Sequence, residues 1–434
     1  MASAEESSTT VRRTGNRATR DWGWVRRVSA RTIVRRVIGA VAALQLAVIA
    51  ALQVVAWRRK RRRPAVTFPS VPPVPFDAGD TEVEIFTYGQ DLYDDMLAEI
   101  RRAKRTVFFE TFIWKDDAIG RAFKRELIAA ADRGVQVHLI WDEFANLVVP
   151  QRFFRFPDNV HAMKHPLVGG GVGFLHPGNV GRDHRKVLVI DSEVAWVGGY
   201  NIGSLYATEW RDTHAKFRGP VVSDLENAFI DFWNMVPTRR PKPLPDVAKR
   251  HWHANMRVHR NLPRHFLYPI RGMYLEAMDR ATRNIWLTHA YLIPDDDMQR
   301  TLADAVERGV DVRIIVPAES NHIEADWVSR SYYRTLLESG VRLFLYQNAM
   351  VHSKTATIDG QWSTIGTANI DSLSLLVNYE INVDMTSVEV AEKLEEIFEV
   401  DLGNCVELTL DEWNKRSPLL KLSEALLRPL RHFL

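Results

Sequence analysis

The sequence predicts an α/β protein of two similar halves, each a mixed sheet flanked by helices, packed about a pseudo-two-fold axis and preceded by one N-terminal membrane helix. Three observations favour this fold: a long motif that occurs twice, strand and helix patterns that follow one order around each copy, and an uncharged apolar segment ahead of both. With 434 residues, 46% of them hydrophobic, the chain can bury one large core or two smaller ones.

The N-terminal region predicts a membrane anchor between basic flanks. Residues 37–57, VIGAVAALQLAVIAALQVVAW, carry no charge, and a helix of this length spans about the 30 Å hydrocarbon layer of a bilayer. RRKRRR follows where a cleaved signal peptide would have small residues, so we expect a retained single-pass anchor; a cleaved signal, a targeting sequence or a buried helix is the alternative. Residues 1–36 then form a basic mobile tail, and residues 58–80 form a basic, proline-rich linker. Basic residues on both sides of the segment leave its orientation open.

The charge distribution argues against a general nucleic-acid binder. The first 63 residues carry 15 Lys and Arg against 3 Asp and Glu, and the remaining 371 carry 42 against 51, or about −9. Affinity for nucleic acid comes mostly from clustered basic side chains, which the acidic body lacks as a whole. The single cysteine, Cys405, excludes an internal disulfide and a multi-cysteine metal site.

One motif occurs twice with every spacing preserved. HRKVLVIDSEVAWVGGYN at residues 184–201 and HSKTATIDGQWSTIGTAN at residues 352–369 both read His, any residue, Lys, four residues, Asp, six residues, Gly, a small residue, one more, Asn. The corresponding pairs are His184 and His352, Lys186 and Lys354, Asp191 and Asp359, Gly198 and Gly366, Gly199 and Thr367, and Asn201 and Asn369. A lone histidine beside a core strand is usually structural, whereas a repeated and fully spaced pair indicates function.

The repetition extends upstream of the motif. The matching segments are AKRTVFFETFIW (103–114) with ATRNIWLTHAYL (281–292), and RGVQVHLIWD (133–142) with RGVDVRIIVP (308–317). In each half these segments predict a strand, a helix that stops at a glycine, and another apolar strand, which is typical of layered α/β domains. We place the first half at residues 81–245 and the second at residues 246–434.

The paired motifs predict a phosphodiester site. Residues i and i+2 of a strand face the same side, so His184 projects with Lys186, and His352 with Lys354. If the two strands meet across the axis, one imidazole can attack phosphorus, the other can protonate the leaving oxygen, and the lysines can stabilise the non-bridging oxygens. No metal or other cofactor is required, because the lysines supply positive charge, and the motif asparagines could donate further hydrogen bonds.

A carboxylate follows each motif histidine at the same distance. Asp212 and Glu380 each lie 28 residues after a motif histidine. A catalytic imidazole needs an acceptor on its far nitrogen, so we expect Asp212 to orient His184 and Glu380 to orient His352, each within its own half; surface salt bridges are the alternative. The residues expected to bind phosphate or to support the catalytic groups are Asn201, Asn369, Asp212, Glu380, Gly199 and Thr367.

Three further features have open interpretations. We count Asp191 and Asp359 with the catalytic motif, although their place at the ends of strands favours bracing a turn over touching substrate. The basic, aromatic segment 249–268 is either a contact for anionic headgroups or a linker between the halves. The terminal segment 419–434 either lies on a membrane surface or packs against the body, and the second is favoured.

The paired H-x-K-x4-D motifs and the following G-G/T-x-N resemble the phospholipase D superfamily, and the wider pattern is similar to bacterial cardiolipin synthases. The segments that carry the resemblance are FETFIWKDD (109–117), RDHRK (182–186), GGYNIGSLY (198–206), WRDTH (210–214), RGVDVRIIVP (308–317) and SYYRTLLESGVRLFLYQ (331–347). The resemblance runs from about Glu82 to the C-terminus and implies two phospholipase D-like halves. Many such synthases have two N-terminal membrane segments, whereas this sequence predicts one.

The resemblance implies a phosphatidyl transfer through a phosphohistidine. One phosphatidylglycerol would give its phosphatidyl group to His184, releasing glycerol, and a second would take it to form cardiolipin, with His352 as acid and then base. The expected partners are anionic phospholipids and a bacterial-type inner or plasma membrane, not nucleic acid; the oligomeric state stays open. The alternatives are a phosphodiesterase that hydrolyses phospholipid or, less favoured, nucleic acid, and a non-catalytic lipid-binding protein.

Overall fold

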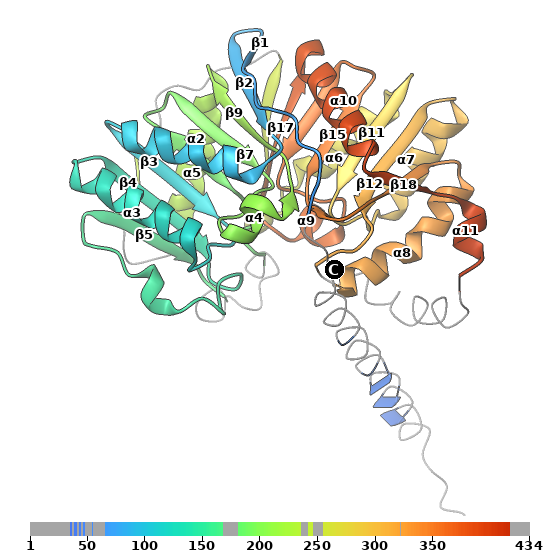
Figure 1. Cartoon of the computed structure of the whole chain (residues 1–434), viewed down its shortest axis with the longest axis horizontal. Helices are drawn as coiled ribbons and strands as arrows, with labels where there is room; N and C mark the ends of the chain where they lie inside the picture. The colour runs from blue at the N-terminus through green and yellow to red at the C-terminus, as the bar shows by residue number, and fades with distance from the viewer. Residues whose placement is uncertain are drawn as a thin grey trace, which may run out of the picture. The chain divides into compact units, whose positions relative to one another are not determined.

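The computed structural model describes residues 66–167, 181–235, 242–245, 255–321 and 323–416, with a few isolated positions between 35 and 54. Two eight-stranded mixed sheets, one in each half, form its framework (Figure 1). The first sheet has the order β1-β2-β9-β7-β6-β3-β4-β5 and the second has the order β10-β17-β16-β15-β11-β12-β13-β18. The predicted α/β fold of two similar halves with mixed sheets is therefore confirmed.

The strands of the first sheet are β1 (Phe76–Ala78), β2 (Thr81–Phe86), β3 (Thr106–Thr111), β4 (Gln136–Asp142), β5 (Val160–His165), β6 (Val187–Ile190), β7 (Val194–Gly198) and β9 (His214–Arg218). Those of the second are β10 (Met256–Asn261), β11 (Asn284–His289), β12 (Asp311–Pro317), β13 (Arg342–Tyr346), β15 (Lys354–Ile358), β16 (Trp362–Gly366), β17 (Glu380–Thr386) and β18 (Cys405–Leu408). From β2 to β5 and from β10 to β13 the two sheets pair their strands in the same order and directions. β1 and β18 are additions at opposite edges of this common plan.

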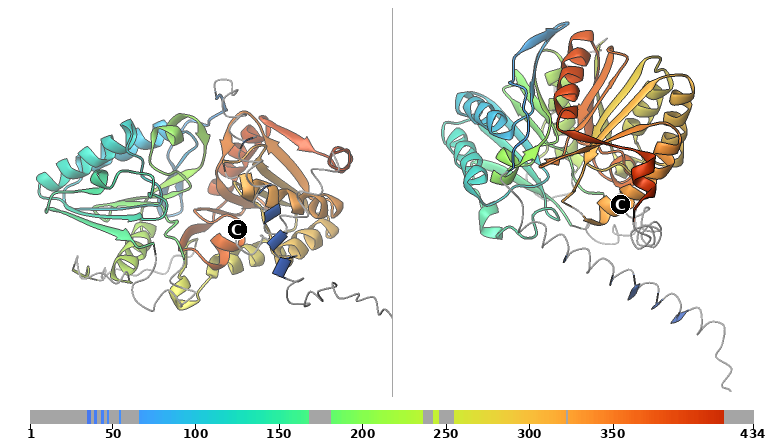
Figure 2. Two further views of the ribbon diagram at one scale, coloured as in Figure 1. Left: turned by 90° about the horizontal axis from the view of Figure 1, so that it is seen from below. Right: turned by 45° about the vertical axis from the view of Figure 1, so that its right-hand side comes forward.

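Helices cover both faces of each sheet. Those of the first half are α2 (Gly89–Arg102), α3 (Ala118–Asp132), α4 (Ser204–Thr208) and α5 (Val221–Met235). Those of the second are α6 (Pro269–Asp279), α7 (Asp296–Glu307), α8 (Ile323–Glu338), α9 (Ser372–Leu376), α10 (Val388–Leu402) and α11 (Leu410–Asn414). In β3 the side chains alternate: Phe109 packs with α2 and α3, and Phe108 packs with α5 on the opposite face. The views in Figure 2 show helices lying against the faces of the sheets.

The predicted glycine stops are present in both halves. Asp117 caps the start of α3, because its side chain accepts a hydrogen bond from the backbone N–H of Gly120. The chain turns after this helix at Gly134 with φ +92°. Asp295 caps the start of α7 in the same way, and this helix is followed by Gly309 with φ +88°. A positive φ favours glycine because a Cβ is disfavoured there, so each RGV segment ends its helix and turns the chain into the next strand.

The strand directions determine at which edge of the first sheet the motif histidine lies. β6 is antiparallel to β3, which is parallel to β4 and β5. The C-terminal ends of β3, β4 and β5 therefore lie at the same edge as the N-terminal end of β6, where His184 and Lys186 precede the strand. One apolar cluster continues from this half into the other, since Val187 and Phe229 share it with Ile381 and Leu394.

Two predictions about the chain's organisation fall largely outside the described residues. The predicted membrane segment 37–57 has only isolated described positions, and the predicted boundary between the halves adjoins residues 246–254, which are not described. Within the part of the chain that the structure describes, no helix combines the length and apolar character needed to cross a bilayer.

Candidate active site

The two motif histidines hold reciprocal positions between the halves. The backbone N–H of His184 donates to the carbonyl of Tyr379 at 3.1 Å, and that of His352 donates to the carbonyl of Arg211 at 2.7 Å. Each bond joins one half to the other, and both residues of the second bond are offset by 168 positions from those of the first. A short parallel pairing between β8 (Trp210–Arg211) and β14 (Met350–Val351) supports the second contact.

The carboxylates pair with the histidines across the halves. His184 Nδ1 lies 3.0 Å from Glu380 Oε2, and His352 Nδ1 lies 2.7 Å from Asp212 Oδ2. The prediction that each acid orients the histidine of its own half was wrong. The spacing of 28 residues is identical in both halves, so it identified the acids without distinguishing the two pairings; the backbone contacts between the halves decide which pairing forms.

The motif lysines fold back onto their histidines. Lys186 Nζ donates to the carbonyl of His184 at 2.6 Å, and Lys354 Nζ donates to the carbonyl of His352 and lies 3.0 Å from that residue's Nδ1. Each imidazole has a carboxylate at Nδ1, which leaves Nε2 as the nitrogen for proton transfer or attack. β6 begins only at Val187, so His184 and Lys186 lie just ahead of the strand expected to contain them.

Burial shifts the pKa values of the whole cluster. It lowers the pKa of Lys186 to about 7 and that of Lys354 to about 8, and each is also affected by nearby charges. It raises the pKa of Glu380 to about 8 and that of Asp212 to about 6. Burial and the two lysines lower the pKa of His184 well below its usual value, so this imidazole is neutral. The two acids and the two lysines therefore have pKa values in the same range, from about 6 to about 8. A bound anion would favour the charged form of the lysines.

Gly199 and Thr367, which are equivalent in the two motifs, support the carboxylates differently. A Cβ on Gly199 would lie 2.0 Å from Asp212 Oδ1, so glycine is needed for the carboxylate to approach the turn. Thr367 instead donates its hydroxyl hydrogen to Glu380 Oε2. Asp212 thus packs directly against the backbone of Gly199, whereas Glu380 accepts a hydrogen bond from the Thr367 side chain.

The motif asparagines are buried on the turns after β7 and β16. Asn201 Oδ1 accepts a hydrogen bond from the Ile113 backbone at 3.2 Å, which fixes the amide group. Asn369 Oδ1 is buried with no hydrogen-bond partner within the described part of the chain. That either amide donates to phosphate stays a prediction.

Asp191 and Asp359 require a correction. Asp191 accepts hydrogen bonds from the backbone N–H groups of Lys104, Arg105 and Thr106, at 2.7 to 2.9 Å. Asp359 accepts equivalent bonds from residues 282–284. Both acids follow the strand that the motif histidine precedes, so they lie at its opposite end. They brace the turn at the end of the strand away from the motif histidines, which contradicts their count among the catalytic residues.

Two buried arginine–carboxylate pairs beside the histidines were not predicted from the sequence. Arg185 binds Glu110 through Nε and Nη2 at 2.7 to 2.9 Å, and Arg211 binds Asp401 through the same atoms at 2.7 and 2.9 Å. Glu110 is a charged residue in the uncharged and mostly apolar surroundings of β3, which was the available signal. Nothing in the sequence linked Arg211 to Asp401, because 190 residues separate them.

Aromatic rings form part of the wall at each histidine. Phe112 meets the His184 ring edge to face, with centroids 4.7 Å apart, and Trp210 lies 5.0 Å from the His352 ring. Lys186 Nζ is also 5.2 Å from the centroid of Phe112. These rings raise the local apolar character and so strengthen charge interactions in the site.

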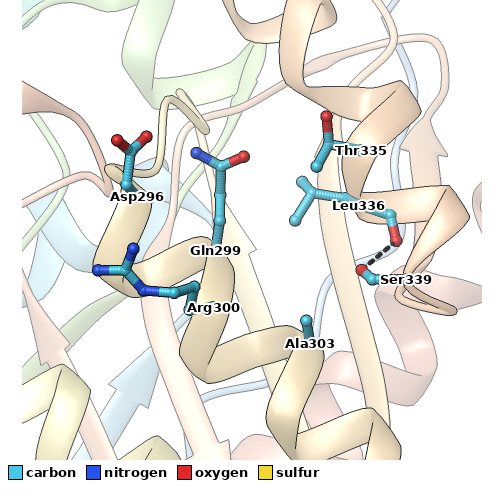
Figure 3. A pocket seen from close by; sticks show the side chains of 7 residues that line it. All are labelled: Asp296, Gln299, Arg300, Ala303, Thr335, Leu336 and Ser339. Carbon is cyan, nitrogen blue, oxygen red and sulfur yellow. Dashed lines mark hydrogen bonds between the residues drawn. The ribbon is translucent and has the colours of Figure 1, made fainter.

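A pocket between α7 and α8 is separate from this cluster (Figure 3). It has a volume of about 260 Å³ and contains no motif residue. The residues that line it are Asp296, Gln299, Arg300, Ala303, Thr335, Leu336 and Ser339. Its mixed lining brings together no catalytic group, so we assign it no chemistry.

Comparison with known proteins agrees with this geometry. A family described as "Cardiolipin synthase, PLD-like domain" matches residues 96–233 and 274–402. A protein named cardiolipin synthase from Clostridium perfringens is 30% identical over 372 residues, covering 80% of this chain and 76% of the relative, and one from Listeria welshimeri is 29% identical over 360 residues, covering 80% and 74%. The crystal structure of a phosphatidylserine synthase from Haemophilus influenzae superposes with a TM-score of 0.62 at 14% identity, covering 84% of this chain and 94% of that one. This last likeness concerns the fold.

The fold and the paired motifs define a phospholipase D-type enzyme in which each histidine meets a carboxylate of the other half. The chain belongs to the phospholipase D superfamily, as a cardiolipin synthase-like phosphatidyltransferase.

Proposed function

We propose that the protein joins two phosphatidylglycerol molecules into cardiolipin and releases glycerol through a phosphohistidine intermediate. The observation that supports this most directly is the reciprocal pairing of His184 with Glu380 and of His352 with Asp212. Each imidazole is held at Nδ1 by a carboxylate, so two Nε2 atoms are available for one phosphodiester. The relatives named cardiolipin synthase favour a lipid as that phosphodiester.

In the first step His184 is the nucleophile. Its neutral Nε2 attacks the phosphorus of one phosphatidylglycerol, and the bond from phosphorus to the glycerol oxygen breaks. His352, protonated at Nε2 and held by Asp212, gives its proton to that oxygen, so glycerol leaves as a neutral alcohol. The two motif lysines neutralise the non-bridging oxygens as negative charge develops on them.

The second step reverses these roles. His352, now neutral, takes the proton from the terminal hydroxyl of a second phosphatidylglycerol. The resulting oxygen nucleophile attacks phosphorus, and the bond to His184 Nε2 breaks. One phosphodiester bond has been exchanged for another, so the reaction needs no external energy source, and both histidines regain their starting protonation.

The substrates are lipids, so the protein must work at a membrane. We propose that residues 37–57 retain it at a bacterial-type cell membrane, with the basic, proline-rich linker 58–80 between anchor and body. A tether of this kind raises the effective concentration of the site at the lipid surface.

Product analysis tests the proposal. Purified full-length protein is incubated with phosphatidylglycerol in detergent micelles, and lipids and free glycerol are measured. We expect cardiolipin and glycerol in equal amounts. Phosphatidic acid without cardiolipin would identify a hydrolase, and no turnover would favour a lipid-binding protein. The variants H184A and H352A should both lack turnover, and substantial activity in both would contradict the shared site.

A further inference from the structure

Exposed apolar side chains gather at one edge of the body. Of the large apolar residues that are exposed between residues 66 and 416 as described, most lie in the connections at the edge where the motif histidines are located. Six of them form what we name the apolar rim: Phe144, Leu147, Val148, Leu167, Phe266 and Leu267. The exposed residues Val74, Val388 and Val406 lie outside these connections.

The loop after β4 brings three rim residues beside His184. Leu147 is 55% exposed and Val148 is 83% exposed, although they lie between two buried residues, Asn146 and Val149. The neighbouring Asn146 is buried and donates to the carbonyl of Phe112 at 2.8 Å. Phe112 in turn contacts the His184 ring. The apolar side chains are thus held outward by an anchored loop next to the proposed nucleophile.

The other rim residues adjoin this loop through residues 181 and 182. The Arg182 guanidinium lies over the Phe144 ring at 5.7 Å, and its Nη2 donates to the carbonyl of Leu167 at 2.8 Å. A Cβ on Gly181 would lie 3.3 Å from Pro263, which opens the turn that carries Phe266 and Leu267. These connections come from both halves, and residues 181 and 182 lie against each of them.

The charges around the rim are mostly basic, in contrast to the acidic body. Arg152, Arg155 and Arg264 are exposed in the same connections, where Asp158 is an exposed acid. The acid nearest to Phe144 in the loop is Glu143, which forms an ion pair with Lys164. Exposed apolar side chains bordered by arginines suit a surface of anionic headgroups over hydrocarbon, whereas nucleic acid would match the arginines alone.

We propose that the apolar rim docks the body onto an anionic lipid bilayer, with Phe144, Leu147 and Val148 in the interfacial layer. The choice of a lipid partner rests on the proposed function, which the docking surface deepens: lipid headgroups reach His184 past Phe112 without their chains crossing water. A headgroup drawn to the arginines enters beside the buried lysines.

A single-cysteine label tests the docking on the full-length protein. Cys405 is the chain's one cysteine, so C405S supplies a background in which V148C and the control V388C each carry an environment-sensitive fluorophore. Val388 follows the far end of β17 and is 47% exposed. In anionic proteoliposomes containing nitroxide-labelled lipid, we expect the label at position 148 to shift to the blue and to lose at least about half its emission, and the label at position 388 to do neither. Equal behaviour at the two positions, whether strong or absent, would overturn the proposal.

Two controls distinguish docking on lipid from catalysis and from contacts between protein segments. The variant H184A in the same background should give the same contrast, so loss of transfer activity and loss of docking are distinguished. If the label at position 148 is shielded from solvent in detergent and becomes exposed when the protein is diluted, the apolar rim contacts a second copy of the protein instead. Shielding in detergent at every protein concentration would assign it to another segment of the same chain. Either result would overturn the proposal.

Discussion

The Nδ1 atom of His352 lies 2.7 Å from Oδ2 of Asp212, although 140 residues separate them and they belong to different halves. His184 and Glu380 form the reciprocal pair. In the described structure each histidine–carboxylate pair therefore exists only where the halves meet. Packing of the halves and assembly of the site are one event, as in a two-fold dimer whose subunits share their active sites.

Crossed pairing predicts which histidine each acid serves. In D212N the amide no longer stabilises protonated His352, so proton donation to the leaving glycerol should weaken by about 10²-fold or more. A lipid analogue with a p-nitrophenol leaving group does not need that proton. Burst release of p-nitrophenol by D212N should therefore stay much closer to that of the unchanged enzyme than glycerol release does.

E380Q is the matched control for this experiment. Glu380 holds the proposed nucleophile, so E380Q should slow the burst with p-nitrophenol and the release of glycerol to a similar extent. The opposite assignment, in which D212N slows both leaving groups equally and E380Q spares p-nitrophenol, would contradict either the pairing or the role of His184 as nucleophile.

The buried lysines predict a loss of substrate capture at alkaline pH. Burial lowers the pKa of Lys186 to about 7 and that of Lys354 to about 8, so both charges are present below this range and are lost above it. The charged forms attract the phosphodiester anion, so kcat/KM should fall as pH rises through 7 to 8. kcat should fall less steeply, because a bound anion raises both pKa values.

K186R distinguishes the lysines from other titrating groups. Arginine stays charged throughout this range but does not reproduce the geometry of an ammonium, so the variant should be slower at every pH while its fall in kcat/KM moves to higher pH. An unchanged position of the fall would assign it to a group other than Lys186.

The repeats and the strand and helix patterns of this sequence predicted the fold. The contacts between segments that are distant in the sequence could not be predicted from it. The repeated skeleton identified the motif residues and both carboxylates because symmetry duplicates local spacing. The same symmetry made the partner of Asp212 ambiguous. The spacing of 28 residues is the same whether each acid pairs with the histidine of its own half or with that of the other half. Arg211 and Asp401 belong to no repeat, and only the packing of α10 brings them together.

The pair of Arg211 with Asp401 predicts a large dependence of stability on one buried acid. Both side chains are almost fully buried, so D401A would leave an unpaired guanidinium in the interior and should lower the free energy of unfolding by about 3–5 kcal/mol. The exposed pair of Arg342 with Glu407 is the control, and E407Q should cost about 1 kcal/mol or less. Urea unfolding in detergent measures both, and similar losses would contradict the difference in burial.

Gly199 makes the position of Asp212 testable without removing a charge. An added Cβ would lie 2.0 Å from Asp212 Oδ1, so G199A should push the carboxylate away from His352 and reduce kcat by about tenfold or more. G272A is the matched control: Gly272 lies in α6 with no atom within 4 Å of an added Cβ, and alanine there should raise stability by up to about 1 kcal/mol. Turnover and urea unfolding are compared for both variants. Full turnover by G199A, with a fold as stable as that of the unchanged protein, would show that catalysis does not depend on Asp212 lying against His352.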